Sequence, residues 1–408
     1  MAFAFATGFS LVVSEDGDLY ASGSKARNNL DRIQKENTNA YTNFQKVDNI
    51  DEPVAFVATG FSHSGLVTDS GKLYMFGPGG NNRLGFGNNE NYPKPTLKPL
   101  LQAIRMLACG GEFTVVLDTD GIVYTWGIND CGQRGQLLEP SQADQIEHNL
   151  AVSNSNRDKF DSKRVVLVSA GRSHAVALTE EGTVYTWGQG RFGQLGLSDM
   201  PVKMDYPSQI DPMHFNYEKV TFVQASRQHT LAVTDAGNAY TFGCGLSGRL
   251  GHGDFEDQIL PRQVDGCNEK IVMGSSHSSH TLLLSENGNV WACGSNSFKQ
   301  LGVESDRDFE PRIIRIDPSR FDGKKVVTVC CDNSSSAAIC KDGSLWTWGC
   351  GRGGKIGQLY VHDFSVPTRV DPLTLDNKRA GRCRLFTGGP RALALAMGSH
   401  AKSSDSPV

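Results

Sequence analysis

The strongest constraint on the fold is a pattern of glycines that returns seven times along the 408 residues. In every copy a first glycine is followed six residues later by a second, and in six copies a third comes eight residues after that. The first glycines lie 50 to 61 residues apart, at Gly17, Gly71, Gly121, Gly182, Gly237, Gly288 and Gly343. Self-similarity at such a period predicts one repeat architecture rather than several independent domains.

Each copy contains the signals of four short strands. Between the first two glycines, residues of one face recur with period two, as Tyr185 and Trp187 do. A second strand precedes the first glycine, which marks a hairpin turn, and an apolar run such as residues 165–168 comes earlier still. A fourth strand follows the third glycine, near Pro207, Pro261, Pro311 and Pro367. Four-stranded units repeated radially predict an all-β, seven-bladed propeller of antiparallel blades, whose closed ring leaves no long sheet edge exposed.

The fourth copy carries the most complete motif. It contains, in order, Ala170-Gly171, His174, Ala177-Leu178-Thr179, Gly182, Val184-Tyr185, Trp187-Gly188 and Gly193-Gln194-Leu195-Gly196. This unit closely resembles the regulator-of-chromosome-condensation repeat, and the resemblance extends over residues 1–397. It implies a seven-bladed propeller, whereas the Gly-His and Trp-Asp signature of the shorter WD repeats is missing.

The two ends of the chain carry partial copies. Residues 385–395 repeat the first two strands alone, and residues 6–17 are a first copy of the same segment. We therefore expect residues 1–400 to form a single propeller of seven repeats plus a C-terminal half repeat, with 401–408 as a flexible tail. Strands from both termini are predicted to close the ring within one blade. The motif does not indicate which terminus supplies the closing strands.

Composition narrows the classes of partner. The net charge of −4 lacks the basic footprint of a nucleic-acid binder. No run approaches the roughly 20 apolar residues that cross a bilayer, and residues 1–9 lack the features of a signal peptide. The ten cysteines show no secreted framework, so we expect reduced thiols in the cytoplasm, the nucleus or a large intracellular assembly.

The residues whose types would suit a metal or phosphate site lie at positions of the repeat motif. His63, His174, His229 and His280 share one register, which predicts structural hydrogen bonds to backbone within each blade rather than a metal ring. Residues 349–356 imitate a phosphate loop, but no Ser or Thr follows Lys355 to hold Mg²⁺. The sequence therefore predicts no catalytic, cofactor-binding or metal site and no enzyme activity.

The preferred function is a protein-interaction scaffold that presents variable loops on a rigid ring. Arg and aromatic residues dominate interface energetics, which favours the loops after the first and third strands and the longest insertion, residues 136–163. The candidate contacts are Phe61, Glu112, Arg172, Arg191, Phe192, Arg227 and Arg352, with Ile146 and Glu147 in the insertion.

Two other functions remain open. The resemblance implies, as one alternative, a guanine-nucleotide exchange factor that acts on a small GTPase, with the insertion as a wedge. The other is a regulatory subunit of a ubiquitin-ligase or cytoskeletal assembly. Light sensing is not expected, because the tryptophans lie in third strands, where packing explains them, and Phe61 follows Gly60 where such photoreceptors carry tryptophan.

Overall fold

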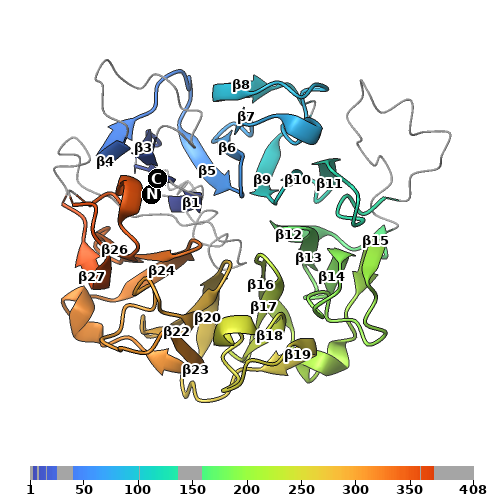
Figure 1. The fold of residues 1–408 in the computed structure, drawn as a ribbon. Coiled ribbons are helices and arrows are strands. Elements are labelled where there is room, and N and C mark those ends of the chain that lie inside the picture. Colours follow the sequence, from blue (N-terminus) through green and yellow to red (C-terminus); the bar gives the residue numbers. More distant parts are fainter. Residues whose placement is uncertain are drawn as a thin grey trace, which may run out of the picture.

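The computed structural model describes residues 3–6, 9–14, 16–24, 40–100, 102–136, 159–358 and 360–371. These residues form seven antiparallel sheets arranged radially around one axis (Figure 1). Six sheets have four described strands and the third has three. The expected seven-bladed all-β propeller is confirmed, and the complete helical segments within the described residues are short 3-10 turns.

The strands follow one another from the axis to the rim in every blade. The first three blades contain β1 (Phe3–Ala6), β2 (Phe9–Val13), β3 (Leu19–Ser24), β4 (Ala40–Lys46); β5 (Val54–Thr59), β6 (Ser64–Thr68), β7 (Leu73–Gly77), β8 (Tyr92–Lys98); and β9 (Ile104–Cys109), β10 (Phe113–Asp118), β11 (Val123–Gly127). The fourth and fifth contain β12 (Val165–Ala170), β13 (His174–Thr179), β14 (Val184–Gln189), β15 (Lys203–Gln209); and β16 (Val220–Ala225), β17 (His229–Thr234), β18 (Ala239–Gly243), β19 (Gln258–Gln263). The sixth and seventh contain β20 (Ile271–Ser276), β21 (His280–Ser285), β22 (Val290–Ser295), β23 (Phe309–Arg315); and β24 (Val326–Cys331), β25 (Ser335–Cys340), β26 (Leu345–Gly349), β27 (Phe364–Arg369). The 3-10 turns are η1 (Gly80–Asn82), η3 (Pro212–Phe215), η4 (Leu246–Gly248), η5 (Pro318–Phe321) and η6 (Arg352–Gly354).

The second and third strands of each blade are buried on both faces, because each blade packs between two neighbours. All six residues of β13 are buried, and Trp187 on β14 is 1% exposed. The outer strands differ: every residue of β15 is half-buried or exposed, and the strand carries Pro207. Proline lacks an N–H donor and is therefore tolerated at this edge of the sheet.

Aromatic side chains between blades tie the connections to the core. Phe215 in η3 packs edge-on against Tyr240 at 5.4 Å, and Phe321 in η5 packs against Trp346 at 5.8 Å between ring centroids. Phe160, at the end of the long insertion, packs in the same way against Tyr185 at 5.2 Å. A buried phenylalanine therefore recurs before the fourth, fifth and seventh blades.

The ring closes between the seventh and first blades by side-chain contacts. Ser10 Oγ donates a hydrogen bond to Lys355 O at 2.6 Å, and Ser22 Oγ donates to Gly354 O at 2.7 Å. All four strands of the first blade come from residues 3–46. Residues 385–395 lie outside the described part of the chain, so a C-terminal strand in this blade stays a prediction.

Candidate interaction face and axial cavity

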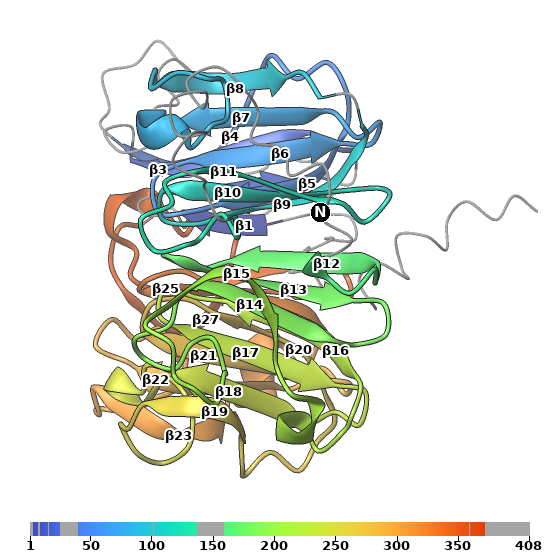
Figure 2. The same ribbon diagram turned by 90° about the vertical axis from the view of Figure 1, so that its right-hand side faces the viewer.

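Two sets of loops emerge on one face of the ring, because successive strands of each blade are antiparallel. We call the connections between first and second strands the hub loops: residues 60–63, 110–112, 171–173, 226–228, 277–279 and 332–334. The connections after the third strands are the rim loops, which include η1, η4 and η6. In the edge-on view these short coils lie on one side of the disc (Figure 2).

Three hub side chains from different blades meet over the axis. The Phe61 ring of the second blade lies 5.4 Å from the His277 ring of the sixth blade. The guanidinium of Arg227, from the fifth blade, lies 6.0 Å from the centroid of Phe61. The structure thus brings together two of the predicted contact residues, Phe61 and Arg227, at the centre of the face.

His277 was not among the predicted residues, although the repeat contains a signal for it. It occupies the position at which the earlier copies have Gly60, Gly110 and Gly171. Because the motif has glycine at this position, the imidazole of His277 is an additional side chain at the point where the blades converge. Departures from a repeat consensus would therefore have identified His277 from the sequence.

The remaining predicted hub residues lie beside this centre. Glu112 forms an ion pair with Arg83 at 3.3 Å, with the Glu112 side chain 46% exposed. Arg172 is exposed, and its backbone carbonyl accepts a hydrogen bond from Gly111 N at 3.1 Å. Arg172 and Glu112 therefore flank each other on adjacent blades.

The predicted rim residues lie farther from the axis. Arg191 and Arg352 are exposed, and Phe192 is half-buried. Arg352 Cζ lies 5.8 Å from the ring centroid of Phe298, an aromatic residue that the sequence analysis did not select. Ile146 and Glu147 lie outside the described residues, so their role stays a prediction.

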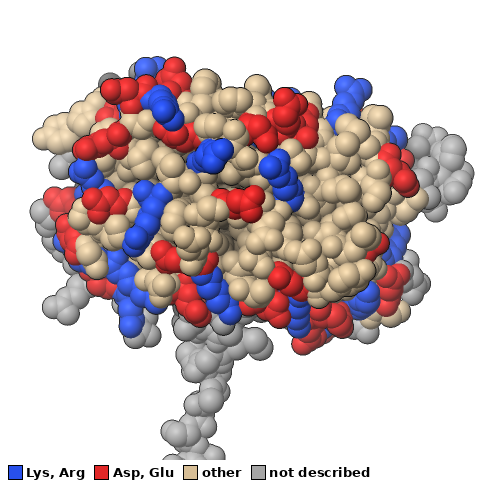
Figure 3. Space-filling view, turned by 90° about the horizontal axis from the view of Figure 1, so that it is seen from below, with Lys and Arg blue, Asp and Glu red and all other residues tan. Residues whose placement is uncertain are grey.

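Exposed apolar side chains gather on the rim loops of the fifth to seventh blades and at the start of β23. Phe255 and Phe309 are 51% and 42% exposed and contact each other edge-on at 6.3 Å. Further members are Leu246, Phe298, Tyr360 and Val361. The outer wall of the ring, in contrast, carries acidic and basic side chains interspersed (Figure 3).

The phosphate-loop imitation has a structural role. Lys355 Nζ lies 2.7 Å from Asp332 Oδ2 and donates to Ser334 Oγ at 2.9 Å, with both charged side chains buried. Asp332 is on a hub loop of the same blade. The lysine therefore neutralises a buried carboxylate rather than facing an open phosphate site.

The four histidines that share one register form hydrogen bonds with hydroxyl side chains of the next blade. The prediction that they bond to backbone within their own blade is therefore wrong. His63 Nε2 lies 2.8 Å from Thr114 Oγ1 of the next blade, and His280 Nε2 lies 2.9 Å from Ser336 Oγ. Burial lowers the pKa of both imidazoles from 6.5 to about 3. Neutral histidines at these positions join neighbouring blades.

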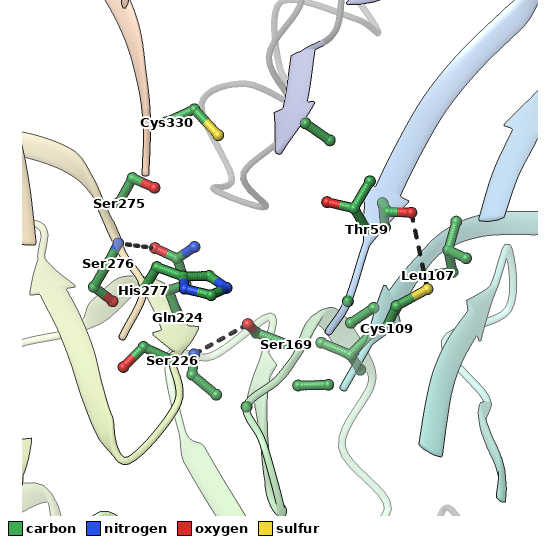
Figure 4. Close-up of a pocket in the computed structure, with 18 of the residues that line it drawn as sticks. Thr59, Leu107, Cys109, Ser169, Gln224, Ser226, Ser275, Ser276, His277 and Cys330 are labelled. Carbon is green, nitrogen blue, oxygen red and sulfur yellow. Dashed lines mark hydrogen bonds between the residues drawn. The ribbon is translucent and has the colours of Figure 1, made fainter. Parts of the chain in front are cut away.

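The hub loops cover one end of an axial cavity of about 140 Å³ (Figure 4). Its wall is made from the inner strands of the second to seventh blades, with Ala4 of β1. Polar side chains bind across neighbouring strands: Ser169 Oγ accepts from Ala225 N at 3.0 Å, and Gln224 Oε1 accepts from Ser276 N at 2.9 Å. The cavity therefore has a polar side built from the fourth to sixth blades.

In the part of the chain that the structure describes, no group of three or more His, Cys, Asp or Glu side chains is placed to hold a metal ion. Nine cysteines within the described ranges are free thiols. None of the described helical turns is long and apolar enough to cross a membrane.

Comparison with known proteins gives the family. A family model described as "RCC1-like domain" matches residues 1–279 and 153–392. The chain is 30% identical over 328 residues to the ultraviolet-B receptor UVR8 of Arabidopsis thaliana, covering 79% of this chain and 71% of that protein.

Two further relatives differ in size and function. The chain is 29% identical to the E3 ubiquitin-protein ligase HERC2 of Homo sapiens, covering 80% of this chain but 6% of that ligase. The crystal structure of Prp20p from Saccharomyces cerevisiae superposes with a TM-score of 0.71 at 20% identity, covering 88% of this chain and 87% of that one. The glycine register, the seven blades and these matches together show that the chain belongs to the RCC1-like domain family.

Proposed function

We propose that this propeller is a non-catalytic protein-interaction scaffold and that its partner binds the face formed by the hub and rim loops. The observation that carries the proposal is the convergence of Phe61 and Arg227 over the axis, with exposed Arg172 beside them. Aromatic and arginine side chains supply most of the binding energy in protein interfaces. The ring holds them on short loops, which limits the entropy lost on binding.

Charge reversal on this face tests the proposal. The protein is immobilised, incubated with cell extract, and the captured proteins are identified by mass spectrometry. The double variant Arg172→Glu and Arg191→Glu is expected to lose the specific partner, since both side chains are exposed. The matched control, Lys219→Glu with Lys270→Glu, reverses two exposed charges on the opposite face and is expected to retain it.

Equal capture by both double variants would place the partner elsewhere and overturn the assignment of this face. Circular dichroism and thermal unfolding of each variant separate a lost contact from a lost fold. The compartment belongs to the proposal as well: we place the partner in the cytoplasm or nucleus, or within a larger assembly.

The second candidate is exchange of guanine nucleotide on a small GTPase. It is supported by the fold shared with Prp20p, whose structure is described together with binding to Gsp1p and histones. Purified protein would then accelerate release of a fluorescent GDP analogue from a small GTPase, and deletion of residues 139–156 would abolish the effect. Exchange by the intact protein would replace the scaffold proposal.

The third candidate is a regulatory role in a ubiquitin-ligase or cytoskeletal assembly. It is supported by the match to HERC2, in which the region resembling this chain is a small part of a ligase. A ubiquitin ligase or cytoskeletal proteins among the captured partners would favour this candidate.

A further inference from the structure

The axial cavity contains polar groups that the scaffold function does not use. Of the described residues that line it, Arg227 is the one with a fully charged side chain. Arg227 Nε is buried and has no hydrogen-bond partner among the described residues. Arg227 as a whole is half-buried, and because a buried donor without a partner is costly, an acceptor bound at Nε would stabilise this side chain.

Two neutral groups lie near the same side of the cavity. Gln224 uses Oε1 to accept from Ser276 N at 2.9 Å, and its amide nitrogen is turned toward the open space (Figure 4). The His277 ring also points into the cavity (Figure 4). Burial, together with the charges of Lys355 and Arg227, lowers the pKa of His277 against the opposing effect of Asp332, which keeps the imidazole neutral at pH 7.

Charge balance selects the ligand class. Lys355 and Asp332 neutralise each other at 2.7 Å, which leaves Arg227 as the charge at the cavity for which the described residues offer no counter-charge. One positive charge balances a monoanion, whereas a dianion such as phosphate would remain undercompensated in a partly desolvated site. A guanidinium also presents paired N–H donors that match the two oxygens of a carboxylate.

The apolar residues of the cavity wall suit the short aliphatic chain of a ligand. They include Ala58, Ala108, Ala170, Met106 and Leu107. An apolar cavity of roughly 150 Å³ admits a ligand the size of benzene, so the 140 Å³ here accommodates a ligand of a few carbon atoms. Phe61 covers the side of the cavity at which Arg227 and His277 lie.

We propose that the axial cavity is a binding site for a short-chain monocarboxylate, held by the Arg227 guanidinium with Gln224 and His277 beside it. The aliphatic end of the ligand lies against the alanine wall, and Phe61 closes the mouth. The site goes beyond the scaffold function: a bound carboxylate would hold Arg227 and Phe61 in place at the centre of the interaction face.

Propionate is the probe for this site. Saturation-transfer NMR and thermal unfolding are recorded with increasing sodium propionate, against sodium chloride at equal ionic strength. We expect saturable binding and a rise in the melting temperature for the wild type. Arg227→Gln is expected to weaken binding at least tenfold, while Lys219→Gln, which removes an exposed positive charge on the opposite face, leaves it unchanged.

Two further variants keep the test decisive if Arg227→Gln unfolds. Arg227→Lys retains the charge but loses the paired donors, so propionate binding should weaken. Ala108→Leu narrows the cavity without touching the charge and should also weaken it. Absence of saturable binding to the wild type, or equal binding by wild type and both Arg227 variants, would overturn the site. Partner capture is tested with Arg172 and Arg191, so the two proposals can fail separately.

Discussion

His174 of the fourth blade places its Nε2 3.0 Å from Thr230 Oγ1 of the fifth blade, and that hydroxyl donates to Gln194 O at 2.8 Å. A hydroxyl has one proton, so with the carbonyl as its acceptor it must receive the hydrogen bond from the histidine. The Nε2 atom of His174 therefore carries a proton, and burial favours the neutral form of the ring. His63, His229 and His280 make equivalent contacts to the next blade.

These histidines predict a loss of stability in mild acid. Burial lowers the pKa of His174 from 6.5 to about 3, so below pH 6.5 the unfolded chain binds a proton that the folded protein excludes. The contribution to stability is complete above pH 6.5 and is lost as the pH falls toward 3, at about 1.4 kcal/mol per pH unit for each histidine. Urea unfolding between pH 7 and pH 5 measures the slope.

Replacement of one histidine tests its share of that slope. His174→Gln is expected to flatten the pH dependence, whatever it does to stability at pH 7. His362→Gln, at an exposed position on a rim loop, is the control and should leave the slope as in the wild type. An unchanged slope in His174→Gln would show that this imidazole is protonated in the folded protein.

Trp187 is expected to be among the most sensitive core positions. The side chain is 1% exposed, and its Nε1 donates to Gln133 O of the third blade at 3.0 Å. Trp187→Ala should cost about 3–5 kcal/mol, the range for large aromatic truncations. Trp187→Phe keeps most of the packing and should cost less. A loss below about 1 kcal/mol in urea unfolding of the alanine variant would contradict this core role.

We expect the C-terminal end of the long insertion to stabilise the fold. Its middle part should be dispensable for stability. Phe160 is 2% exposed and contacts Tyr185 and Trp187 edge-on at 5.2 and 6.1 Å. Phe160→Ala should therefore destabilise the protein by about 3–5 kcal/mol. Replacing residues 139–156 with a short Gly-Ser linker should leave thermal stability nearly unchanged. A deletion as damaging as Phe160→Ala would mean that the removed residues belong to the core.

The buried pair of Asp332 and Lys355 makes a fourth prediction. Removing one partner leaves the other charge buried and uncompensated, which typically costs about 3–5 kcal/mol. Asp332→Asn and Lys355→Met should each show such a loss in urea unfolding. The double variant should lose less than the sum of the two, because no charge is stranded. Additive losses would show that the two side chains do not depend on each other.

Much of the blade was predictable from local sequence. Period-two alternation identified the strands, and the turn glycines mark backbone that other residues adopt with strain: Gly182 has φ +93°, and a Cβ there would lie 2.5 Å from Lys219 Cγ. The aromatic third strands were predicted as core because they recur in every repeat, and Trp187 is buried as expected. These features depend on residues within one copy.

The candidate site was predictable only in part. The contact residues Phe61, Arg172 and Arg227 were predicted because arginine and aromatic residues in the loops after the first strands favour interfaces, but the contact of Phe61 with His277 was not foreseen. Likewise, the histidines were recognised as structural, but their bonds were assigned to the wrong blade. In both cases the partner lies on another repeat.

The sequence by itself determined the number of blades, the strands within each and the buried aromatic positions, since these follow from backbone periodicity and glycine conformation inside a single repeat. Only the tertiary structure decided that His174 bonds to Thr230, that Phe61 meets His277 and Arg227 across the axis, and that a polar cavity opens beneath them. The physical reason is that these contacts depend on how blades pack around a closed ring, which brings together residues far apart along the chain.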